Sequence, residues 1–489
     1  MPAPSLSDLT RAMERAKTYD EWKQAAIAHD EKSSAAAWKK EDKSSRYGYH
    51  RIRQRLERLR ELRADDDPHE LLFYLNEGIH GNMDGIGKPA LYTEAKFGTK
   101  ELITEYLSEL EAGIEQIAQS PDAIIPFADK LDFFRRASHC YGRSALMLSG
   151  GGSLGPFHLG VTKALFEQGL VPTVLSGSSA GSVVAGVLGT HDDAALGALL
   201  QEEISVRLSP GPIGQRMTVD DVERTIAELI PDMTFQEAFA HTGRQINVSV
   251  APSTLHQTSR LLNAITSPNV FIREAVLASC AIPGVFPPVR LAARDAHGNR
   301  KPYLPGSRWV DGSVTDDLPA KRLTRLYGVN HFITSMINPL VLWSVRDSDM
   351  EGGLFSRWWD IYQRASKEWL RATYPMTMNA VRNVYPLNVA TRMWYNVITQ
   401  DYTADINIIP RQRLWNPSKL LAILSEEDTR ALVEEGERAT WPRIEMIRNC
   451  TRISRTLDAI LDDFELEHTN RFGHVHARGH MTHSDHANA

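Results

Sequence analysis

Cysteine is scarce in this sequence, with three residues in 489. Cys140, Cys280 and Cys450 lie far apart and in no spacing that suits a metal site. A disulfide-stapled fold is therefore excluded, and the three residues are interpreted as free thiols in a reducing compartment. A strong excess of one charge is also missing, because the formal net charge is −6. The chain has no overall excess of basic residues, so nucleic acid is not expected as a partner.

Long apolar runs are missing as well. The N-terminus lacks the apolar stretch of a secretory signal, and stretches such as Val183–Leu188 fall far short of the roughly 20 residues of a membrane-spanning helix. We therefore expect a cytoplasmic protein that is soluble or peripheral and that would meet a membrane from one side only. The hydrophobic content of 42% is that of a globular protein, and the length predicts about three structural units.

Helical periodicity dominates the first quarter of the chain. Arg51–Arg63 carries apolar residues at steps of three and four, which predicts an amphipathic helix with a strongly basic outer face. Thr99–Ile117 is a second amphipathic stretch, with Thr99 placed as its N-cap. The pattern predicts a helical N-terminal module over residues 1–125.

Short apolar strands alternate with helical stretches from Ser144 onward, as in a parallel α/β sheet. The expected strands are Ser144–Leu148, Val171–Ser176, Gln245–Val250, Arg308–Val310 and Phe332–Ser335, and the first helices are Pro156–Gln168 and Ser182–Leu188. This predicts an α/β domain over residues 140–340, followed by a mainly helical extension over 341–467. Residues 468–489 hold six of the 17 histidines. A metal-binding tail is possible in such a composition, but a disordered terminus is the favoured interpretation.

The pentapeptide G-S-S-A-G at Gly177–Gly181 is the strongest chemical motif in the chain. It lies between a predicted strand and a predicted helix, where a G-x-S-x-G motif lifts its central serine onto a sharp turn. Gly177 and Gly181 have no side chain to clash in that turn, and the following helix points its N-terminus at Ser179. The motif predicts Ser179 as a nucleophile, with a chance match as the alternative.

A second glycine-rich stretch, GGGSLG at Gly150–Gly155, also lies between a strand and a helix. Its spacing fits a dinucleotide-binding loop, but that site needs an acidic residue at the end of the second strand. The second strand ends in Leu175 and Ser176, so the nucleotide interpretation fails. The favoured interpretation is an oxyanion hole of consecutive backbone amides, with a purely structural glycine turn as the alternative. The expected donors are Gly150, Gly151, Gly152 and Ser153.

A serine nucleophile needs a base. Asp311 ends a short strand and is followed by Gly312, which permits a tight turn toward the sheet edge that carries the motif serine. On this evidence alone, an ordinary turn aspartate is the better-supported interpretation. Five histidines after Ser179 have no distinctive context: His191, His241, His256, His297 and His331.

The three motifs GGGSLG, GSSAG and DGS stand in the order found in patatin-like acyl hydrolases, which the middle of the chain resembles. The stretches ASCAIPGVFPPV and WVDGSVTDDLP are similar to the triacylglycerol-lipase branch of that family. Further similarity to this branch lies in YDEWKQAAIAHD, KPALYTEAKFGTKELITEYL, ITQDYTADINIIP and GERATWPRIEMI. The resemblance covers roughly Tyr19 to Ile447.

The resemblance implies a Ser–Asp dyad without histidine, with Ser179 as nucleophile and Asp311 as base. It also implies an α/β fold with a patatin-like parallel-sheet core and helices on both faces. Mainly helical regions flank this core, and the N-terminal one resembles a lipase-associated module known as DUF3336. No metal and no organic cofactor are implied. Because an ordinary carboxyl is a weak base at neutral pH, the site is expected to be partly dry.

Two residues depart from the patatin pattern. Leu154 stands where patatins usually carry Arg or Lys, and Ser313 stands where they carry Gly or Ala; both are usual in the lipase branch. Leucine offers no charge to a phosphate head group, so we expect a preference for neutral glycerides over phospholipids.

The implied function is hydrolysis of acylglycerol esters by a triacylglycerol lipase, through an acyl-enzyme, on lipid substrates at a lipid or membrane surface. Phospholipase A or lysophospholipid acyltransferase activity at the same dyad is the first alternative, and a non-catalytic lipid-surface protein is the second. The tryptophans and basic residues of Trp343–Trp394 suit a lipid interface, with core packing as an equal alternative. His158, just after the glycine loop, is expected to be a packed structural histidine rather than one that orients the loop.

Overall fold

The computed structural model describes residues 4–201, 213–253, 259–313, 317–339, 341–342, 373, 404–411 and 420–479. The chain forms two compact units, and each unit is made of two separate stretches. The sheet unit comprises Met1–His29 and Ser144–Ile447, and the helical unit comprises Asp30–Arg143 and Arg448–Ala489. This division differs from the predicted succession of segments. The first helices belong with the sheet, and the C-terminal helix belongs with the N-terminal helices.

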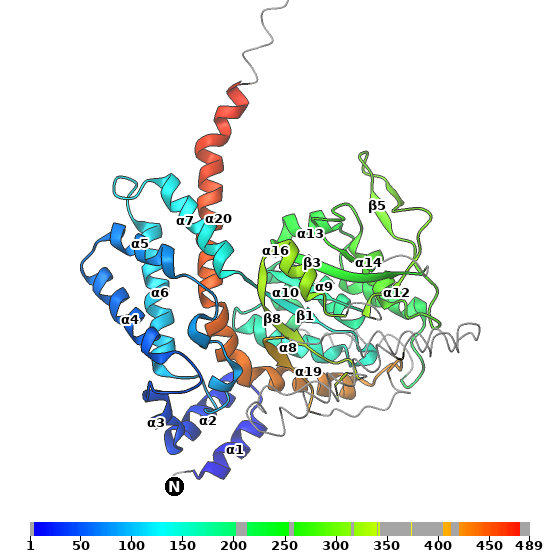
Figure 1. Ribbon diagram of the computed structural model, residues 1–489. Helices are drawn as coiled ribbons and strands as arrows, with labels where there is room; N and C mark the ends of the chain where they lie inside the picture. The colour runs from blue at the N-terminus through cyan, green and yellow to red at the C-terminus, as the bar shows by residue number, and fades with distance from the viewer. Residues whose placement is uncertain are drawn as a thin grey trace, which may run out of the picture. The chain divides into compact units, whose positions relative to one another are not determined.

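Seven strands form the central sheet of the sheet unit, in the order β4-β3-β2-β1-β8-β9, with β7 also paired to β3 (Figure 1). The strands are β1 (Arg143–Leu148), β2 (Val174–Gly177), β3 (Gln245–Pro252), β4 (Arg260–Leu262), β7 (Trp309–Asp311), β8 (Val329–Ser335) and β9 (Ile406–Ile408). The pairs β1–β2, β2–β3 and β8–β9 are parallel, which confirms the predicted parallel core. Strands β4 and β7 run antiparallel to β3, so one edge of the sheet is mixed. The connection from β3 to β4 is too short for the crossover that a parallel neighbour requires.

Helices cover both faces of the sheet, as predicted. Ala145 and Met147 of β1 pack in one cluster with Leu323 and Tyr327 of α16. Successive strand residues point to opposite faces, so Leu146 and Leu148 are buried on the other face. That face carries α8 and α9, because right-handed crossovers place both helices on one side. The helices of this unit, with the small hairpin, are α1 (Leu6–Arg15), α8 (Pro156–Glu167), α9 (Ala180–Thr190), α10 (Asp193–Gln201), α12 (Val219–Leu229), α13 (Phe235–Thr242), α14 (Ile272–Cys280), α16 (Ala320–Tyr327), α19 (Glu426–Thr440), β5 (Ala292–Arg294) and β6 (Arg300–Pro302).

The part of the chain after residue 340 is only partly helical where it is described. Ile406–Ile408 forms strand β9, which the sequence pattern did not predict. Helices α19 and α8 pack so closely that a β-carbon on Gly160 or Gly436 would overlap the backbone of the other helix. The predicted lipid-docking stretch Trp343–Trp394 lies outside the described residues.

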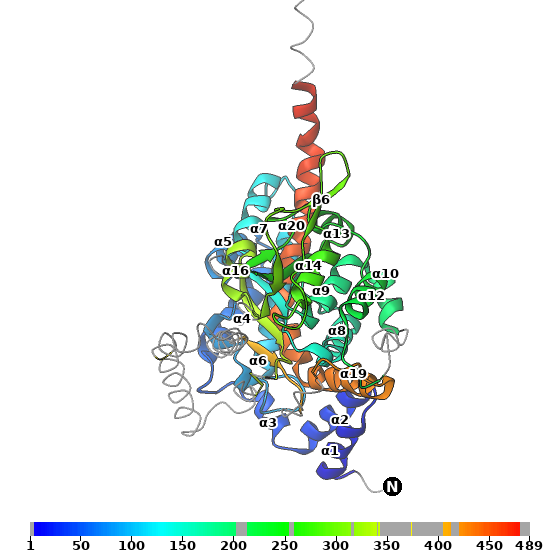
Figure 2. The ribbon, with the colours of Figure 1, turned by 90° about the vertical axis from the view of Figure 1, so that its right-hand side faces the viewer.

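The helical unit is built from α3 (Ala35–Lys40), α4 (Tyr49–Ala64), α5 (Pro68–Gly78), α6 (Glu101–Gln119), α7 (Phe127–Tyr141) and most of α20 (Ile444–Gly479), while α2 (Tyr19–Lys32) spans the division (Figure 2). Residues 1–125 were predicted as the helical module, but α7 continues it to Tyr141. Thr99 is not the N-cap of α6, because Lys100 holds that position and the Thr99 hydroxyl donates to Leu91 O. The Lys100 ammonium is buried and donates to the carbonyls of Trp38 and Glu41.

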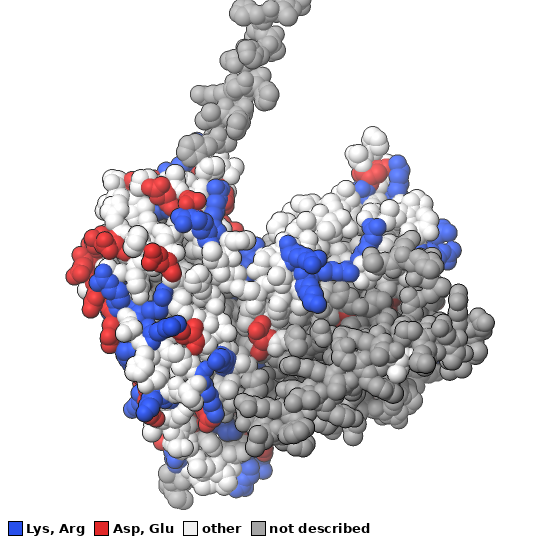
Figure 3. All heavy atoms as spheres, viewed as in Figure 1, with Lys and Arg blue, Asp and Glu red and all other residues white. Residues whose placement is uncertain are grey.

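The basic face of α4 is largely neutralised by neighbouring groups. Arg53 pairs with Asp42, and Arg55 donates to Gly78 O. Arg60 and Arg63 pair with glutamates of α6. Acidic and basic side chains accordingly interleave over this part of the surface (Figure 3). These arginines hold helices together rather than form a free cationic surface.

The start of the predicted disordered tail is helical. Helix α20 runs unbroken from Ile444 to Gly479, whereas disorder was expected from His468. Arg471 pairs with Glu467 one turn earlier and with Asp122, and both pairs support the helix beyond that point. Residues 480–489 lie outside the described part of the chain.

Candidate active site

The predicted strand–turn–helix context of Ser179 is present. Strand β2 ends at Gly177, helix α9 begins at Ala180, and Ser179 lies between them with φ 50° and ψ −124°. A non-glycine residue with positive φ is strained by about 1–3 kcal/mol, which is typical of functional turns. A β-carbon on Gly177 would overlap Gly181 O, and one on Gly181 would overlap Leu148 O. The two glycines therefore let the turn close tightly enough to present the serine.

Asp311 lies at the end of β7, next to Ser179. Its backbone N–H donates to Ala281 O at 2.9 Å, and its Oδ1 accepts the Ser313 N–H at 2.8 Å. The Ser179 side chain lies close enough to this carboxyl to lower its pKa. Only 3% of Asp311 is exposed, and burial raises its pKa to about 6 against the lowering effects of Ser313 and Ser179. The site has the dryness that the sequence argument required.

The histidines considered as bases are engaged elsewhere. His191 Nδ1 lies 2.9 Å from Val187 O, and His331 Nδ1 lies 2.9 Å from the Ser144 hydroxyl. His241 and His297 are exposed. His256 is outside the described residues. Asp311, by contrast, lies close enough to Ser179 for that side chain to lower the carboxyl pKa.

The glycine loop after β1 passes beside Ser179 and Ser313. A β-carbon on Gly150 would lie 3.4 Å from Ser179 Cβ and 2.9 Å from Ser313 Cβ. One on Gly151 would overlap Ile337, and one on Gly152, which has φ 57°, would overlap Leu420 O. The loop is packed so closely that side chains at these positions have no room.

Two of the four predicted oxyanion donors are already bonded to other groups. The Gly150 N–H donates to Asp317 Oδ1 at 2.8 Å, and the Ser153 N–H donates to Leu420 O at 2.9 Å. The amides of Gly151 and Gly152 donate to no group within the described residues. The predicted set of four is therefore too broad, because the fold gives Gly150 and Ser153 acceptors of their own.

Ser279 also supports the nucleophile, although no sequence motif predicts this role. Its hydroxyl accepts the Ser179 N–H at 2.9 Å and donates to Ser249 O at 2.8 Å. Both partners are backbone groups far away in sequence, so no local pattern marks this serine. The stretch ASCAIPG, noted only for its family resemblance, contains it.

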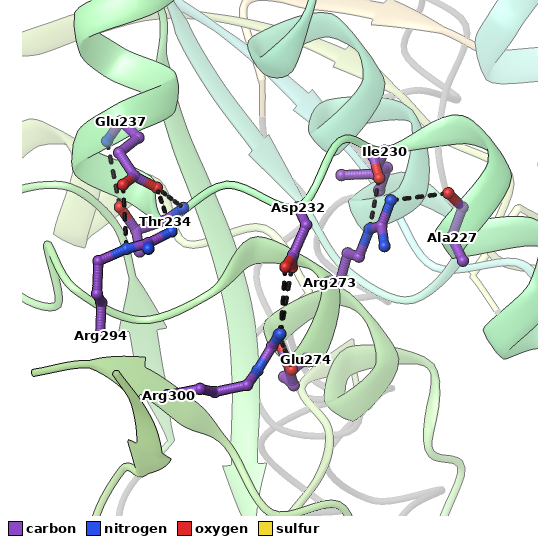
Figure 4. Close-up of polar contacts among 9 residues, drawn as sticks. All are labelled: Ala227, Ile230, Asp232, Thr234, Glu237, Arg273, Glu274, Arg294 and Arg300. Atoms are coloured by element: carbon purple, nitrogen blue, oxygen red, sulfur yellow. Dashed lines mark hydrogen bonds and ion pairs between the residues drawn. The ribbon is translucent and has the colours of Figure 1, made fainter. Parts of the chain in front are cut away.

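Helix α14, which ends just after Ser279, is fixed by a cluster of arginines (Figure 4). Figure 4 shows Arg300 between Asp232 and Glu274, and Arg273 directed at the carbonyls of Ala227 and Ile230. The Arg300 guanidinium also lies 3.9 Å from the ring centroid of Phe271, the residue before the helix. In the same view, Arg294 of the hairpin pairs with Glu237. These contacts hold α14 against α12, α13 and the hairpin, and thereby fix Ser279.

His158 is both a packed histidine and a contact of the glycine loop. It is fully buried, with Nε2 2.9 Å from Ser149 O and Nδ1 2.7 Å from the Ser335 hydroxyl. A carbonyl can only accept, so Nε2 carries the hydrogen and Nδ1 accepts from Ser335. Burial lowers the pKa of His158 to about 4, so the ring is neutral. His158 is therefore packed in the core, as expected, and it also donates a hydrogen bond to Ser149, the residue before the glycine loop.

An apolar cavity opens beside Ser179. On α9 it is lined by Ala180, Val183, Val184 and Val187. On α12 it is lined by Val222, Thr225, Ile226 and Leu229. No charged side chain lines it within the described residues. Leu154 is 1% exposed and does not line the cavity, so it packs beneath the loop and cannot select lipids there.

No group of three or more metal-ligating side chains is found among the described residues. In the same part of the chain, no helix is long and apolar enough to cross a membrane.

Two family descriptions match this sequence. "Domain of unknown function (DUF3336)" matches residues 5–139, and "Patatin-like phospholipase" matches residues 146–324. The second range contains Ser179, Asp311 and the glycine loop.

Several curated proteins are similar over most of the chain. Triacylglycerol lipase 4 of Saccharomyces cerevisiae is 32% identical, over 89% of this chain and 51% of its own length. Triacylglycerol lipase ptl3 of Schizosaccharomyces pombe is 30% identical, over 91% of this chain and 95% of its own length. The chain spans about half the length of the first relatives, such as triacylglycerol lipase 4. Among solved structures, VipD from Legionella pneumophila is 15% identical over 65% of this chain and 67% of its own, with a TM-score of 0.29.

Proposed function

Because the chain belongs to the patatin-like phospholipase family, we propose that it is a serine lipase that hydrolyses the carboxylic esters of acylglycerols. The observation that carries the proposal is the buried Asp311 carboxyl close to Ser179, beside a cavity with no charged lining among the described residues. The two similar yeast proteins are named triacylglycerol lipases, which supports a neutral glyceride as substrate.

In the proposed mechanism, Ser179 Oγ attacks the ester carbonyl carbon while its proton passes to Asp311. The amides of Gly151 and Gly152, with that of Ala180 after the nucleophile, stabilise the negative charge on the carbonyl oxygen. When the tetrahedral intermediate collapses, the ester bond breaks and the leaving alcohol takes the proton from Asp311. Water then attacks the acyl-enzyme, again giving a proton to Asp311, and the fatty acid leaves as Ser179 regains its hydrogen.

The raised pKa of Asp311 suits this role. With a pKa of about 6, the carboxylate is mostly ionised at neutral pH and is a stronger base than an ordinary aspartate. The desolvation that raises the pKa also strengthens the amide–oxyanion interaction. The exclusion of water therefore favours both proton transfer to Asp311 and stabilisation of the oxyanion.

The acyl chain is proposed to lie in the cavity between α9 and α12. The lining residues of α9 run from Ala180 to Val187, which is about two turns, or roughly 12 Å, beyond the nucleophile. An extended alkyl chain of roughly nine carbons spans that distance, given C–C bonds of about 1.5 Å. The rest of a long acyl chain would extend beyond this stretch.

Filling the distal part of this cavity is expected to shorten the preferred acyl chain. Val187→Phe should lower kcat/KM for oleoyl glycerides by about tenfold or more while leaving butyryl esters near the wild-type value. Rates across a series of chain lengths test this. Leu188→Phe is the matched control, because Leu188 is buried on the same helix but does not line the cavity. An equal loss for both chain lengths in Val187→Phe would contradict the assignment.

The first alternative function is a phospholipase or lysophospholipid acyltransferase at the same dyad. Because Leu154 is buried, it does not contact the substrate and cannot favour glycerides over phospholipids. The uncharged lining of the cavity still favours a neutral lipid. The deciding experiment compares triacylglycerol, diacylglycerol, phospholipid and lysophospholipid with an acyl donor, each as an emulsion or vesicle, with product analysis. We expect free fatty acid release to be fastest from the neutral glycerides. Faster release from phospholipid, or transfer to lysophospholipid, would replace the lipase proposal.

Such a substrate would place the protein at a lipid surface, as a peripheral partner of a droplet or membrane. A non-catalytic surface protein is the second alternative, and the intact dyad argues against it.

A further inference from the structure

Asp317 is a buried carboxylate that contacts three segments of the site. Only 1% of the residue is exposed. Its Oδ1 accepts the Gly150 N–H at 2.8 Å, and its Oδ2 accepts Asn338 Nδ2–H at 3.1 Å. Its backbone carbonyl accepts the Ser178 hydroxyl at 3.1 Å. One residue thus joins the glycine loop, the nucleophile turn and the segment after β8.

The burial of a carboxylate at this position requires hydrogen bonds that offset its desolvation. Aspartate is rarely fully buried unless its oxygens are hydrogen-bonded, because desolvation of the charged or polar group is unfavourable. Here one oxygen binds a backbone amide at the first residue of the glycine loop. A carboxylate is a stronger acceptor for such an amide than a neutral oxygen.

Hydrogen bonds to the N–H and the carbonyl of Gly150 fix the orientation of its two peptide groups. The N–H is held by Asp317, and the carbonyl accepts the Ser149 hydroxyl at 3.1 Å. That hydroxyl also accepts the Ile337 N–H at 2.8 Å, and Ser149 O lies 2.9 Å from His158 Nε2. The start of the loop is therefore fixed on both sides, and the next amides, of Gly151 and Gly152, are the ones that remain to bind a ligand.

We propose that Asp317 is a positioning residue for the acyl-transfer step, acting through the glycine loop. By holding the Gly150 amide away from the substrate, it orients the amides of Gly151 and Gly152 toward the carbonyl oxygen that Ser179 attacks. The inference rests on the proposed ester hydrolysis.

Asp317 also stands close in sequence to the proposed base. Asp311 and Asp317 are six residues apart, and Ser313, between them, donates its N–H to Asp311 and packs against Gly150. Asp311 lies close to the nucleophile, and Asp317 accepts a hydrogen bond from the loop. Asp311, Ser313 and Asp317 thereby keep the base and the oxyanion donors in register with Ser179.

Asp317→Ala and Asp317→Asn together test the proposal. Asp317→Ala removes the acceptor for Gly150, so kcat should fall about 100-fold with KM nearly unchanged, as on loss of an oxyanion donor. Asp317→Asn keeps an oxygen for Gly150, and Asn338 can flip its amide to accept from the new Nδ2. This variant should retain kcat within about tenfold of the wild type. Both measurements use the full chain on a glyceride substrate, with folding checked by thermal unfolding.

Two results would overturn the positioning role: a folded Asp317→Ala variant with wild-type kcat, or an Asp317→Asn variant as impaired as Asp317→Ala. If Asp317→Ala does not fold, Asn338→Ala replaces it, since that change removes only the second partner and should lower kcat severalfold at constant KM. Unchanged kcat there would also overturn the role. Failure of the proposed function is distinguishable, because it would show as an inactive wild type whose Ser179 does not react with a phosphonate.

Discussion

Ser179→Ala is expected to abolish ester hydrolysis completely while leaving the protein folded. The hydroxyl is the proposed nucleophile, and its removal leaves no group at that position to form the acyl-enzyme. Residual rates near those of the uncatalysed reaction are expected, a loss of several orders of magnitude. Hydrolysis of triolein emulsion and covalent labelling by a serine-reactive phosphonate are the two measurements.

Ser45→Ala is the matched control, because Ser45 is an exposed serine of the helical unit. It should hydrolyse substrate and take up label like the wild type. Thermal unfolding should be similar in all three proteins, since alanine fits the same backbone turn as serine. A folded Ser179→Ala variant that keeps even a tenth of the activity would rule out the nucleophile assignment.

Asp311→Asn is expected to be inactive and yet more stable than the wild type at neutral pH. Asparagine keeps the shape of the side chain but cannot accept the serine proton, so turnover should fall by about 10³-fold or more. The stability gain follows from the carboxyl pKa. Burial raises this pKa from 3.8 to about 6, which means that folding disfavours the ionised form.

The sign of the pH effect is fixed by that shift. Below pH 3.8 the carboxyl is protonated in the folded and unfolded states alike, so it adds no penalty. Between the two pKa values the penalty grows, and above about pH 6 it is complete, at about 3 kcal/mol. The free energy of unfolding of Asp311→Asn should therefore exceed that of the wild type at pH 7.5, and this difference should vanish near pH 3.5. Denaturant unfolding at both pH values measures it.

Asp295→Asn provides a control of the opposite sign. Lys301 and nearby backbone amides lower the pKa of Asp295 to about 2, so its ionised form stabilises the fold above pH 3.8. Its replacement should lower stability at neutral pH, with a smaller difference as pH falls toward 2. If Asp311→Asn behaved in the same way, Asp311 would be a structural aspartate and not a buried base.

The order of strands and helices around the nucleophile could be predicted because those elements are local. Residues 144–148 alternate between two buried faces, and the glycines at 177 and 181 mark a turn that only a strand followed by a helix produces. Strand β9 could not be predicted in this way, since its three residues acquire their conformation from pairing with β8. Thr99 illustrates the same limit, because its hydroxyl bonds to Leu91 O instead of capping the next helix.

The candidate site shows the same contrast. Ser179 could be predicted from its pentapeptide, whereas Asp311 needed the family resemblance, because a strand-end aspartate before glycine is common in turns. Ser279 and Asp317 could not be predicted from local patterns, because each binds a backbone amide more than 90 residues away. Leu154 was placed in the loop correctly, but its burial depends on packing that spacing does not reveal.

The interleaving of the two units along the chain has a consequence for synthesis on the ribosome. Chains usually begin to fold from the N-terminus as domains emerge. Here Met1–His29 belongs with residues up to Ile447, and Asp30–Arg143 belongs with the helix that starts at Arg448. Neither unit has all of its parts until nearly the whole chain has been made. An early helix such as α7, whose Phe127 and Phe134 pack against Phe464 of α20, would wait for a late partner. This predicts a need for chaperones that shield nascent chains.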